Sequence, residues 1–144
     1  MRTVTYAQTL NVPAAAAWAV FSDFGNFFEW NGLTEIPHEV VCDGIGMIRL
    51  MTVEGLGRIG ERLDAMDHTA RTQNYSLVEG EPLGMVTYQA EVRFAEIGAE
   101  RCEIQWTGQF TGHDGADLDE MATNVSGSYA GMSTALETFT RAKS

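Results

Sequence analysis

Two charged residues interrupt the apolar alternation of two neighbouring strand-like segments. When every second residue is taken, Arg49 lies between Met47 and Met51. In the same way, Glu61 lies between Ile59 and Leu63. Residues two apart in a strand share a face of the sheet, so both charges are expected on an apolar face. Burying a charge is costly unless it is paired. Arg49 and Glu61 are therefore the first candidates for a functional site.

Acid–base catalysis is the chemistry that this pair predicts. An apolar wall favours the protonated form of a carboxylic acid, and a neighbouring guanidinium favours the carboxylate. The balance predicts that Glu61 exchanges a proton near neutral pH, as general acid–base catalysis requires. Arg49 keeps its charge, so its expected role is to hold an oxyanion or enolate. Dehydration, aldol-type cyclisation and isomerisation need no more than this. The alternative is that the two side chains only pair with each other, or with water.

Further residues on the same strand faces complete an expected cavity. One parity of the later strands is apolar and carries two tyrosines, whereas the opposite parity is polar and charged. An apolar pocket with a few convergent polar groups is typical of a small-molecule site. The tyrosines would orient a substrate oxygen. The alternation also places Ala65 on this face, after Leu63. The predicted ligand-binding residues are Tyr75, Tyr88, Trp106, Met47, Met51, Leu63, Phe28 and Tyr129.

The segments that carry these residues predict antiparallel strands. Between about residues 36 and 111, β-branched and aromatic residues alternate with polar ones and are separated by turns, most of which contain glycine. Such close spacing favours a meander. The expected strands lie near 2–11, 38–42, 46–53, 58–66, 70–78, 85–96 and 101–111.

Three segments predict helices. Residues 14–22 are rich in alanine, and residues 26–30 suit a second short helix or turn. From Leu118 to Phe139 the apolar residues recur at helical spacing for about six turns. Acidic residues begin this segment and basic residues end it, as the helix dipole favours. A long amphipathic helix must cover an apolar sheet face, which predicts an α+β fold.

Length and charge limit the class of protein. The chain has 144 residues and a net charge of −11, which suits one domain spanning 1–144. The acidity argues against a nucleic-acid partner and against docking on an anionic membrane. No signal peptide or membrane span is expected, so the predicted location is cytoplasmic. The oligomeric state is left open, a homodimer included.

Neither the cysteines nor the histidines predict a metal site or a cofactor. Cys42 and Cys102 lie far apart without metal-ligand spacing, and free thiols are expected. His38, His68 and His113 lie near predicted turns and share no helix or strand spacing. The predicted partner is therefore a small hydrophobic or aromatic molecule alone.

A set of sequence features extends in order over nearly the whole chain: residues 12–18 and 21–28, Trp30, residues 60–63 with Asp67, Tyr75, Trp106 and residues 129–132. In their order and spacing these features resemble the SRPBCC superfamily, and within it the polyketide cyclase/dehydrase and lipid transport branch. The resemblance implies a helix-grip fold: a seven-stranded antiparallel β-sheet wrapped around a long C-terminal α-helix, with two short helices after the first strand.

Locally the chain is also similar to the plant lachrymatory factor synthases. Arg49, Glu61, Tyr75 and Tyr88 match an arginine, a glutamate and two tyrosines of those enzymes, where the first two serve proton transfer. Plant abscisic-acid receptors of the superfamily use a matching glutamate only to hold ligand through water. The resemblance therefore implies a polar pocket floor rather than one reaction. A cyclase- or dehydratase-like lyase, a non-catalytic carrier or sensor of small molecules or lipids, and an interaction module all remain open.

Overall fold

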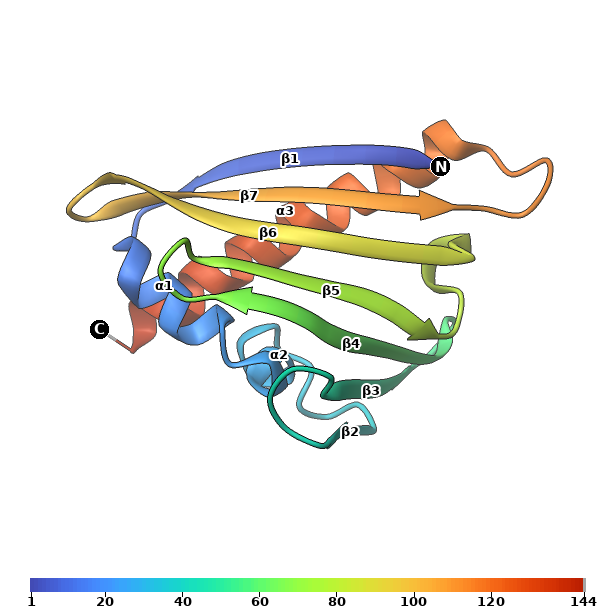
Figure 1. Ribbon diagram of the computed structural model, residues 1–144, viewed down its shortest axis with the longest axis horizontal. Helices are drawn as coiled ribbons and strands as arrows, with labels where there is room; N and C mark the ends of the chain where they lie inside the picture. The colour runs from blue at the N-terminus through green and yellow to red at the C-terminus, as the bar shows by residue number, and fades with distance from the viewer. Residues whose placement is uncertain (144) are drawn as a thin grey trace.

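A seven-stranded antiparallel sheet and a long C-terminal helix dominate the computed structural model, which describes residues 1–143 (Figure 1). This confirms the predicted helix-grip fold. The strands are β1 (Arg2–Leu10), β2 (His38–Val41), β3 (Ile48–Val53), β4 (Gly57–Asp67), β5 (Thr72–Glu79), β6 (Thr87–Gly98) and β7 (Arg101–Thr111). The helices are α1 (Ala14–Phe21), α2 (Phe27–Trp30) and α3 (Leu118–Ala142), with 3-10 turns η1 (Phe24–Asn26) and η2 (Pro82–Gly84).

The strand order is β1-β7-β6-β5-β4-β3-β2, so the first strand pairs with the last. Figure 1 shows α3 crossing diagonally behind the sheet, with α1 near its C-terminal end and α2 nearer to β3 and β4. The sheet and α3 therefore form two layers, and the segment from α1 to α2 closes one end between them. This arrangement leaves the inner face of β3 to β6 opposite the N-terminal half of α3.

Local sequence explains where the helices begin. Pro13 precedes α1 in an extended conformation, and the alanines that follow favour helix. The Asp117 side chain accepts a hydrogen bond from the backbone N–H of Glu120 at 3.1 Å and so caps α3. The buried residues of α3 then recur every three or four positions and face the sheet: Met121, Val125, Tyr129, Ser133, Leu136 and Thr140.

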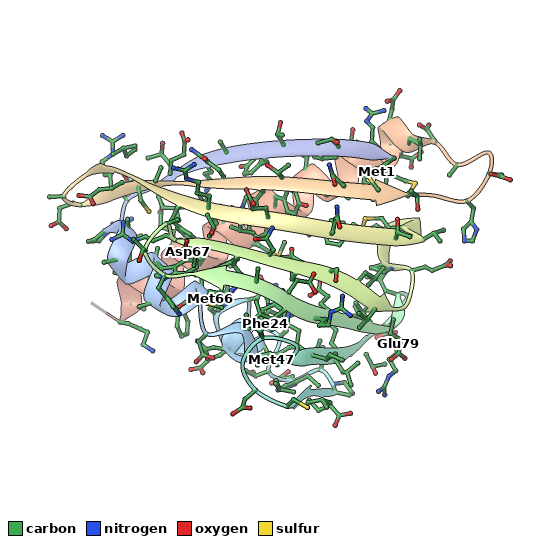
Figure 2. The ribbon with its side chains drawn as sticks, viewed as in Figure 1. Met1, Phe24, Met47, Met66, Asp67 and Glu79 are labelled. Atoms are coloured by element: carbon green, nitrogen blue, oxygen red, sulfur yellow. The ribbon has the colours of Figure 1, made fainter. Side chains whose placement is uncertain are left out.

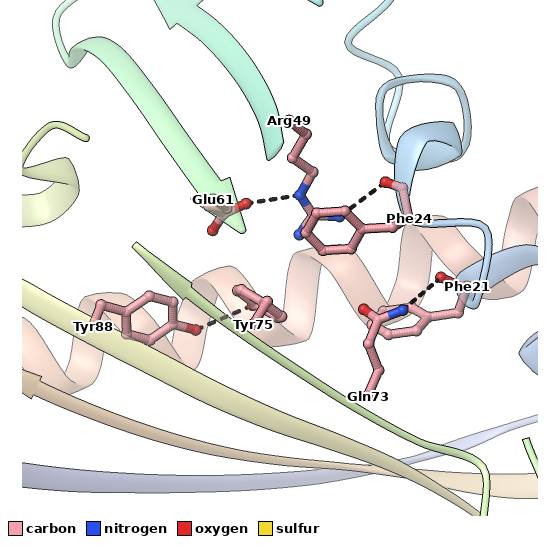
Figure 3. Close-up of polar contacts among 7 residues, drawn as sticks. All are labelled: Phe21, Phe24, Arg49, Glu61, Gln73, Tyr75 and Tyr88. Carbon is pink, nitrogen blue, oxygen red and sulfur yellow. Dashed lines mark hydrogen bonds and ion pairs between the residues drawn. The ribbon is translucent and has the colours of Figure 1, made fainter. Parts of the chain in front are cut away.

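Polar side chains of the sheet hold the α1–α2 segment in place. Arg49 Nη1 donates to the carbonyl oxygen of Phe24 at 3.3 Å, and Gln73 Nε2 donates to that of Phe21 at 3.4 Å (Figure 3). Trp18 Nε1 donates to His68 Nδ1 at 3.1 Å. The aromatic residues of this segment are buried as a group: Trp18, Phe21, Phe24, Phe27, Phe28 and Trp30.

The prediction that Ala65, near the end of β4, points toward the cavity is wrong. Ala65 is exposed, because the register of β4 against β5 shifts between Leu63 and Ala65. A bulge adds a residue and turns the following side chains to the opposite face. Met66 (labelled in Figure 2) therefore takes the inward position and pairs with the buried Gln73.

Gly108 on β7 provides the room that brings α3 close to the sheet. A Cβ built at this position would collide with the Tyr129 hydroxyl. Gly108→Ala is therefore expected to destabilise the protein by about 1–3 kcal/mol, the usual range for overpacking. Urea unfolding would measure this loss.

The matched control is Gly98→Ala at the end of β6, where a Cβ meets no atom within 4 Å. Adding Tyr129→Phe to Gly108→Ala should recover part of the loss, because the colliding oxygen is gone. Equal stability of the Gly108→Ala and Gly98→Ala variants would contradict the close approach.

Candidate functional site

A cavity of about 470 Å³ lies between the inner face of β3 to β6 and the N-terminal half of α3. Its wall is mostly apolar, and segments from α2 and η2 contribute to its rim. Six of the ten residues predicted for the site line this cavity: Arg49, Glu61, Tyr75, Tyr88, Met51 and Tyr129. The cavity thus combines an apolar interior with one carboxylate, one guanidinium and three phenols.

Arg49 and Glu61 form a buried ion pair on directly opposed positions of β3 and β4. Arg49 Nε donates to Glu61 Oε1 at 2.9 Å, and the two side chains are only 5% and 13% exposed (Figure 3). The guanidinium carbon also lies 3.9 Å from the ring centroid of Phe24 and 4.1 Å from that of Phe27. Aromatic faces attract a cation, so the charge is stabilised where water is largely excluded.

Arg49 and Glu61 differ in which of their polar atoms are already hydrogen-bonded to the protein. Arg49 Nε and Nη1 both have protein partners. The other carboxylate oxygen of Glu61, Oε2, has no hydrogen-bond partner among residues 1–143, and Glu61 borders the cavity. The arrangement can therefore hold Glu61 in one orientation while leaving an oxygen for a ligand.

The three cavity tyrosines are linked through their hydroxyl groups. The Tyr75 and Tyr88 oxygens lie 3.2 Å apart, and those of Tyr88 and Tyr129 lie 2.5 Å apart. Burial raises the pKa of Tyr75 and Tyr88 well above 10 and that of Tyr129 to about 12. The Glu61 carboxylate adds to the increase at Tyr75 and Tyr129. All three phenols therefore stay protonated at neutral pH.

Together these five side chains form a polar row across the sheet: Arg49, Glu61, Tyr75, Tyr88 and Tyr129. Arg49 faces Glu61 directly. Tyr75 lies two residues from the direct partner of Glu61, and Tyr88 has the same relation to Tyr75. Diagonal neighbours on one face remain within reach of long side chains. Tyr129 ends the row from α3, above the glycine of β7.

Four predicted site residues lie outside the cavity wall: Trp106, Met47, Leu63 and Phe28. Trp106 stacks on Tyr129 with ring centroids 4.5 Å apart and donates from Nε1 to Ser133 Oγ at 2.9 Å. It thereby positions the last phenol of the polar row. Leu63 is core and Phe28 stacks on His38. The half-buried Met47 directly precedes β3 (Figure 2), and its side chain lies near Gly25.

The sequence analysis missed several residues of the wall. Val125 and Met132 flank Tyr129 at helical spacing on α3, so their position was readable from the period. Leu33, Pro82 and Leu83 come from loops, where no periodic signal exists. Leu83 adopts a left-handed conformation, with φ of 56°, inside η2.

Other reactive groups are placed apart from the cavity wall. Burial raises the pKa of the Cys102 thiol to about 11, and Cys42 is exposed. Within residues 1–143, no His, Cys, Asp and Glu side chains cluster in a way that could hold a metal ion. None of the helices in that range is both long and apolar enough to cross a membrane.

Comparison with known families supports the sequence resemblance. A family model described as polyketide cyclase / dehydrase and lipid transport matches residues 1–139. A comparison with curated proteins found no match.

Solved structures share the fold. XoxI from Bacillus cereus aligns with a TM-score of 0.80 and 21% identity, covering 96% of this chain and 94% of that one. Norcoclaurine synthase from Thalictrum flavum, solved with dopamine and hydroxybenzaldehyde, aligns with a TM-score of 0.75 and 21% identity, covering 96% of this chain and 85% of that one. At these identities the likeness is one of fold.

The buried ion pair predicts a large difference between two arginines. Arg49→Met leaves the Glu61 carboxylate without its partner and is expected to destabilise the protein by about 3 kcal/mol. Arg62→Met is the control, because Arg62 pairs with Asp64 at 2.8 Å but is 48% exposed, and the expected loss is below about 1 kcal/mol. Urea unfolding of both variants would compare them, and Glu61→Leu should restore stability to Arg49→Met. Equal losses at the two arginines would contradict the burial of the pair.

The linked phenols predict a loss of stability in alkali. The pKa values of the three phenols are raised in the folded state. Their contribution to the free energy of unfolding is therefore complete below about pH 10 and is lost as the pH rises towards about 12. Urea unfolding between these limits should show the decline, and absorbance at 295 nm should show Tyr75, Tyr88 and Tyr129 still protonated at about pH 11. Replacing the three by phenylalanine should flatten the decline. Ionisation of these three tyrosines in the folded protein at that pH would refute this expectation.

Proposed function

This chain belongs to the polyketide cyclase / dehydrase and lipid transport family, and on that basis we propose that it binds a small hydrophobic or aromatic molecule in the cavity beneath α3. The volume of about 470 Å³ suits a ligand of one to three rings. Aromatic and aliphatic walls supply the affinity, and the polar row restricts the orientation of the ligand.

Within this cavity, Glu61 is proposed to move a proton on the bound molecule. The observation that carries this proposal is the buried carboxylate of Glu61, a residue that lines the cavity, which Arg49 holds at 2.9 Å through one of its two oxygens. A fixed carboxylate in an apolar site is suited to general acid–base catalysis. Arg49 orients the carboxylate and stabilises its charge. Cyclisation, dehydration and isomerisation are the reactions that such a group supports, and they would make the protein a cyclase- or dehydratase-like enzyme.

A non-catalytic carrier or sensor of small molecules or lipids is the second candidate. It is favoured by the internal pairing of Arg49 and Glu61, because each already satisfies part of the other's charge. In this case the polar row would recognise the ligand and no bond would change. The two candidates differ in what Glu61 does after binding.

Binding in the cavity can be tested with tetralin, an apolar bicyclic probe. Ser128 is exposed and lines the cavity from α3, so Ser128→Trp should obstruct the entrance and weaken tetralin binding at least about 10-fold by calorimetry. Thr123→Trp is the matched control, since Thr123 is exposed on the same helix and is not part of the cavity wall. Unchanged binding in Ser128→Trp would contradict the assigned cavity. Native mass spectrometry of the fresh protein would add the identity of any retained ligand.

Proton transfer by Glu61 can be tested with 2-tetralone, whose protons beside the carbonyl exchange with D2O. The protein should accelerate this exchange, and Glu61→Gln should reduce the protein-dependent rate about 100-fold while 2-tetralone still binds, as loss of a general base does. Exchange would be followed by proton NMR. A full rate in Glu61→Gln would refute the catalytic role, and binding without exchange in the unaltered protein would favour the carrier.

A further inference from the structure

Asn31 and Gly32 form the only Asn-Gly pair in the chain, and they lie at the rim of the cavity. Asn31 lines the cavity and is half-buried, whereas Gly32 is exposed to water. The side-chain amide of Asn31 has no hydrogen-bond partner among residues 1–143. Because glycine has no side chain, its backbone nitrogen can approach the amide carbon of a preceding asparagine more closely than that of any other residue.

The end of α2 explains why a glycine follows Asn31. The backbone N–H of Leu33 donates to the carbonyl oxygen of Phe28 at 2.7 Å, and that of Gly32 donates to the carbonyl oxygen of Glu29 at 3.3 Å. Gly32 has a φ of 70°, in the left-handed region. These two bonds and this conformation form a Schellman motif, which glycine adopts without a steric cost. The fold of the rim therefore requires the Asn-Gly pair to stay exposed beside the cavity.

One hydrogen bond restrains this pair from reacting. Attack on the Asn31 amide requires the Gly32 nitrogen to lose its hydrogen, so the bond from Gly32 to Glu29 must open first. At 3.3 Å this bond is longer than the usual range for N–H···O bonds. The helix that it ends has only four residues, Phe27–Trp30. Such a turn can open locally without unfolding the rest of the domain.

We propose that Asn31 is a modification site at which the chain reacts with itself. The Gly32 nitrogen forms a bond to the side-chain amide carbon of Asn31 and gives its proton to water. The C–N bond of the side-chain amide breaks, and that nitrogen takes up a proton and leaves as ammonia. Water then opens the resulting cyclic imide. Opening at one carbonyl gives aspartate, and opening at the other gives isoaspartate, in which the main chain runs through the former side chain.

Both products change the rim of the cavity. Each adds a carboxylate to a wall on which Glu61 is the one carboxylate among residues 1–143. Isoaspartate also lengthens the main chain by one atom between residues 31 and 32. The two hydrogen bonds of the Schellman motif can then no longer form together, and Leu33, which lines the cavity, is displaced. The reaction therefore alters both the charge and the shape of the rim.

A bound ligand is expected to suppress the reaction, and this part of the inference rests on the proposed function. Phe27, Asn31 and Leu33 all line the cavity, so residues at the start and at the end of the turn contact its contents. A ligand in the cavity stabilises the closed turn, and only the empty protein then reacts. Empty protein would thus lose its original rim with time, whereas occupied protein would keep it.

The test follows the unaltered protein in mildly alkaline buffer by peptide mass spectrometry. The peptide that contains Asn31 should gain one dalton, and chromatography should separate its aspartate and isoaspartate forms. Asn124 is the internal control, because it also lines the cavity and is exposed but precedes the β-branched Val125 within α3. Asn31→Gln should stop the release of ammonia, since its longer side chain would have to form a larger ring.

Ligand control is measured in the same experiment. Tetralin at about ten times its dissociation constant should slow the conversion of Asn31 about 10-fold, in proportion to the fraction of empty protein. The chain unfolded in urea provides the rate without the restraint of the Schellman motif, and tetralin should not change that rate.

Each contrary result has a separate meaning. If Asn31 keeps its amide in the empty folded protein for as long as the unfolded chain needs to lose it, the modification site is overturned. Equal conversion of Asn31 and Asn124 would overturn it as well. If tetralin binds but does not slow the conversion, the proposed function stands and ligand control is overturned. If tetralin does not bind, the proposed function fails, and the conversion of Asn31 in the empty protein alone decides whether the modification site stands.

Discussion

The pairing of Arg49 with Glu61 is the interaction on which the site depends. Neither charge would be stable alone in an apolar interior, because the free-energy cost of removing it from water would exceed the gain from packing. Direct opposition on adjacent strands brings the two groups to 2.9 Å. The rings of Phe24 and Phe27 then enclose the guanidinium. As a result, the sheet can present a carboxylate to a cavity that is otherwise apolar.

The same guanidinium connects the site to the closure of the fold. Its Nη1 donates to the carbonyl of Phe24, so the charge that positions Glu61 also anchors the turn between α1 and α2. Gln73 anchors the end of α1 in the same way. Polar groups of the sheet thus serve both the cavity and the segment that closes it. A change at Arg49 would therefore affect stability and any chemistry together.

The apposition of sheet and helix creates the second half of the polar row. Tyr75 and Tyr88 come from strands, but the chain of phenols is completed only by Tyr129 from α3, at 2.5 Å from Tyr88. Gly108 and Trp106 make this approach possible, one by lacking a side chain and the other by stacking. The cavity is consequently bordered by an acid held on one side and a set of donors held on the other.

The strands, the helices and the inward direction of Arg49, Glu61, Tyr75 and Tyr88 were predictable from the sequence, because alternation and helical period are local properties of the chain. The exposure of Ala65 was not, since a bulge depends on how two strands pair. Nor was it readable that Trp106, Met47, Leu63 and Phe28 stand behind the cavity wall while Leu33, Pro82 and Leu83 join it. The face of the sheet on which a side chain lies follows from the pattern of its neighbours in sequence. The boundary of the cavity instead depends on how side chains from distant elements pack against one another.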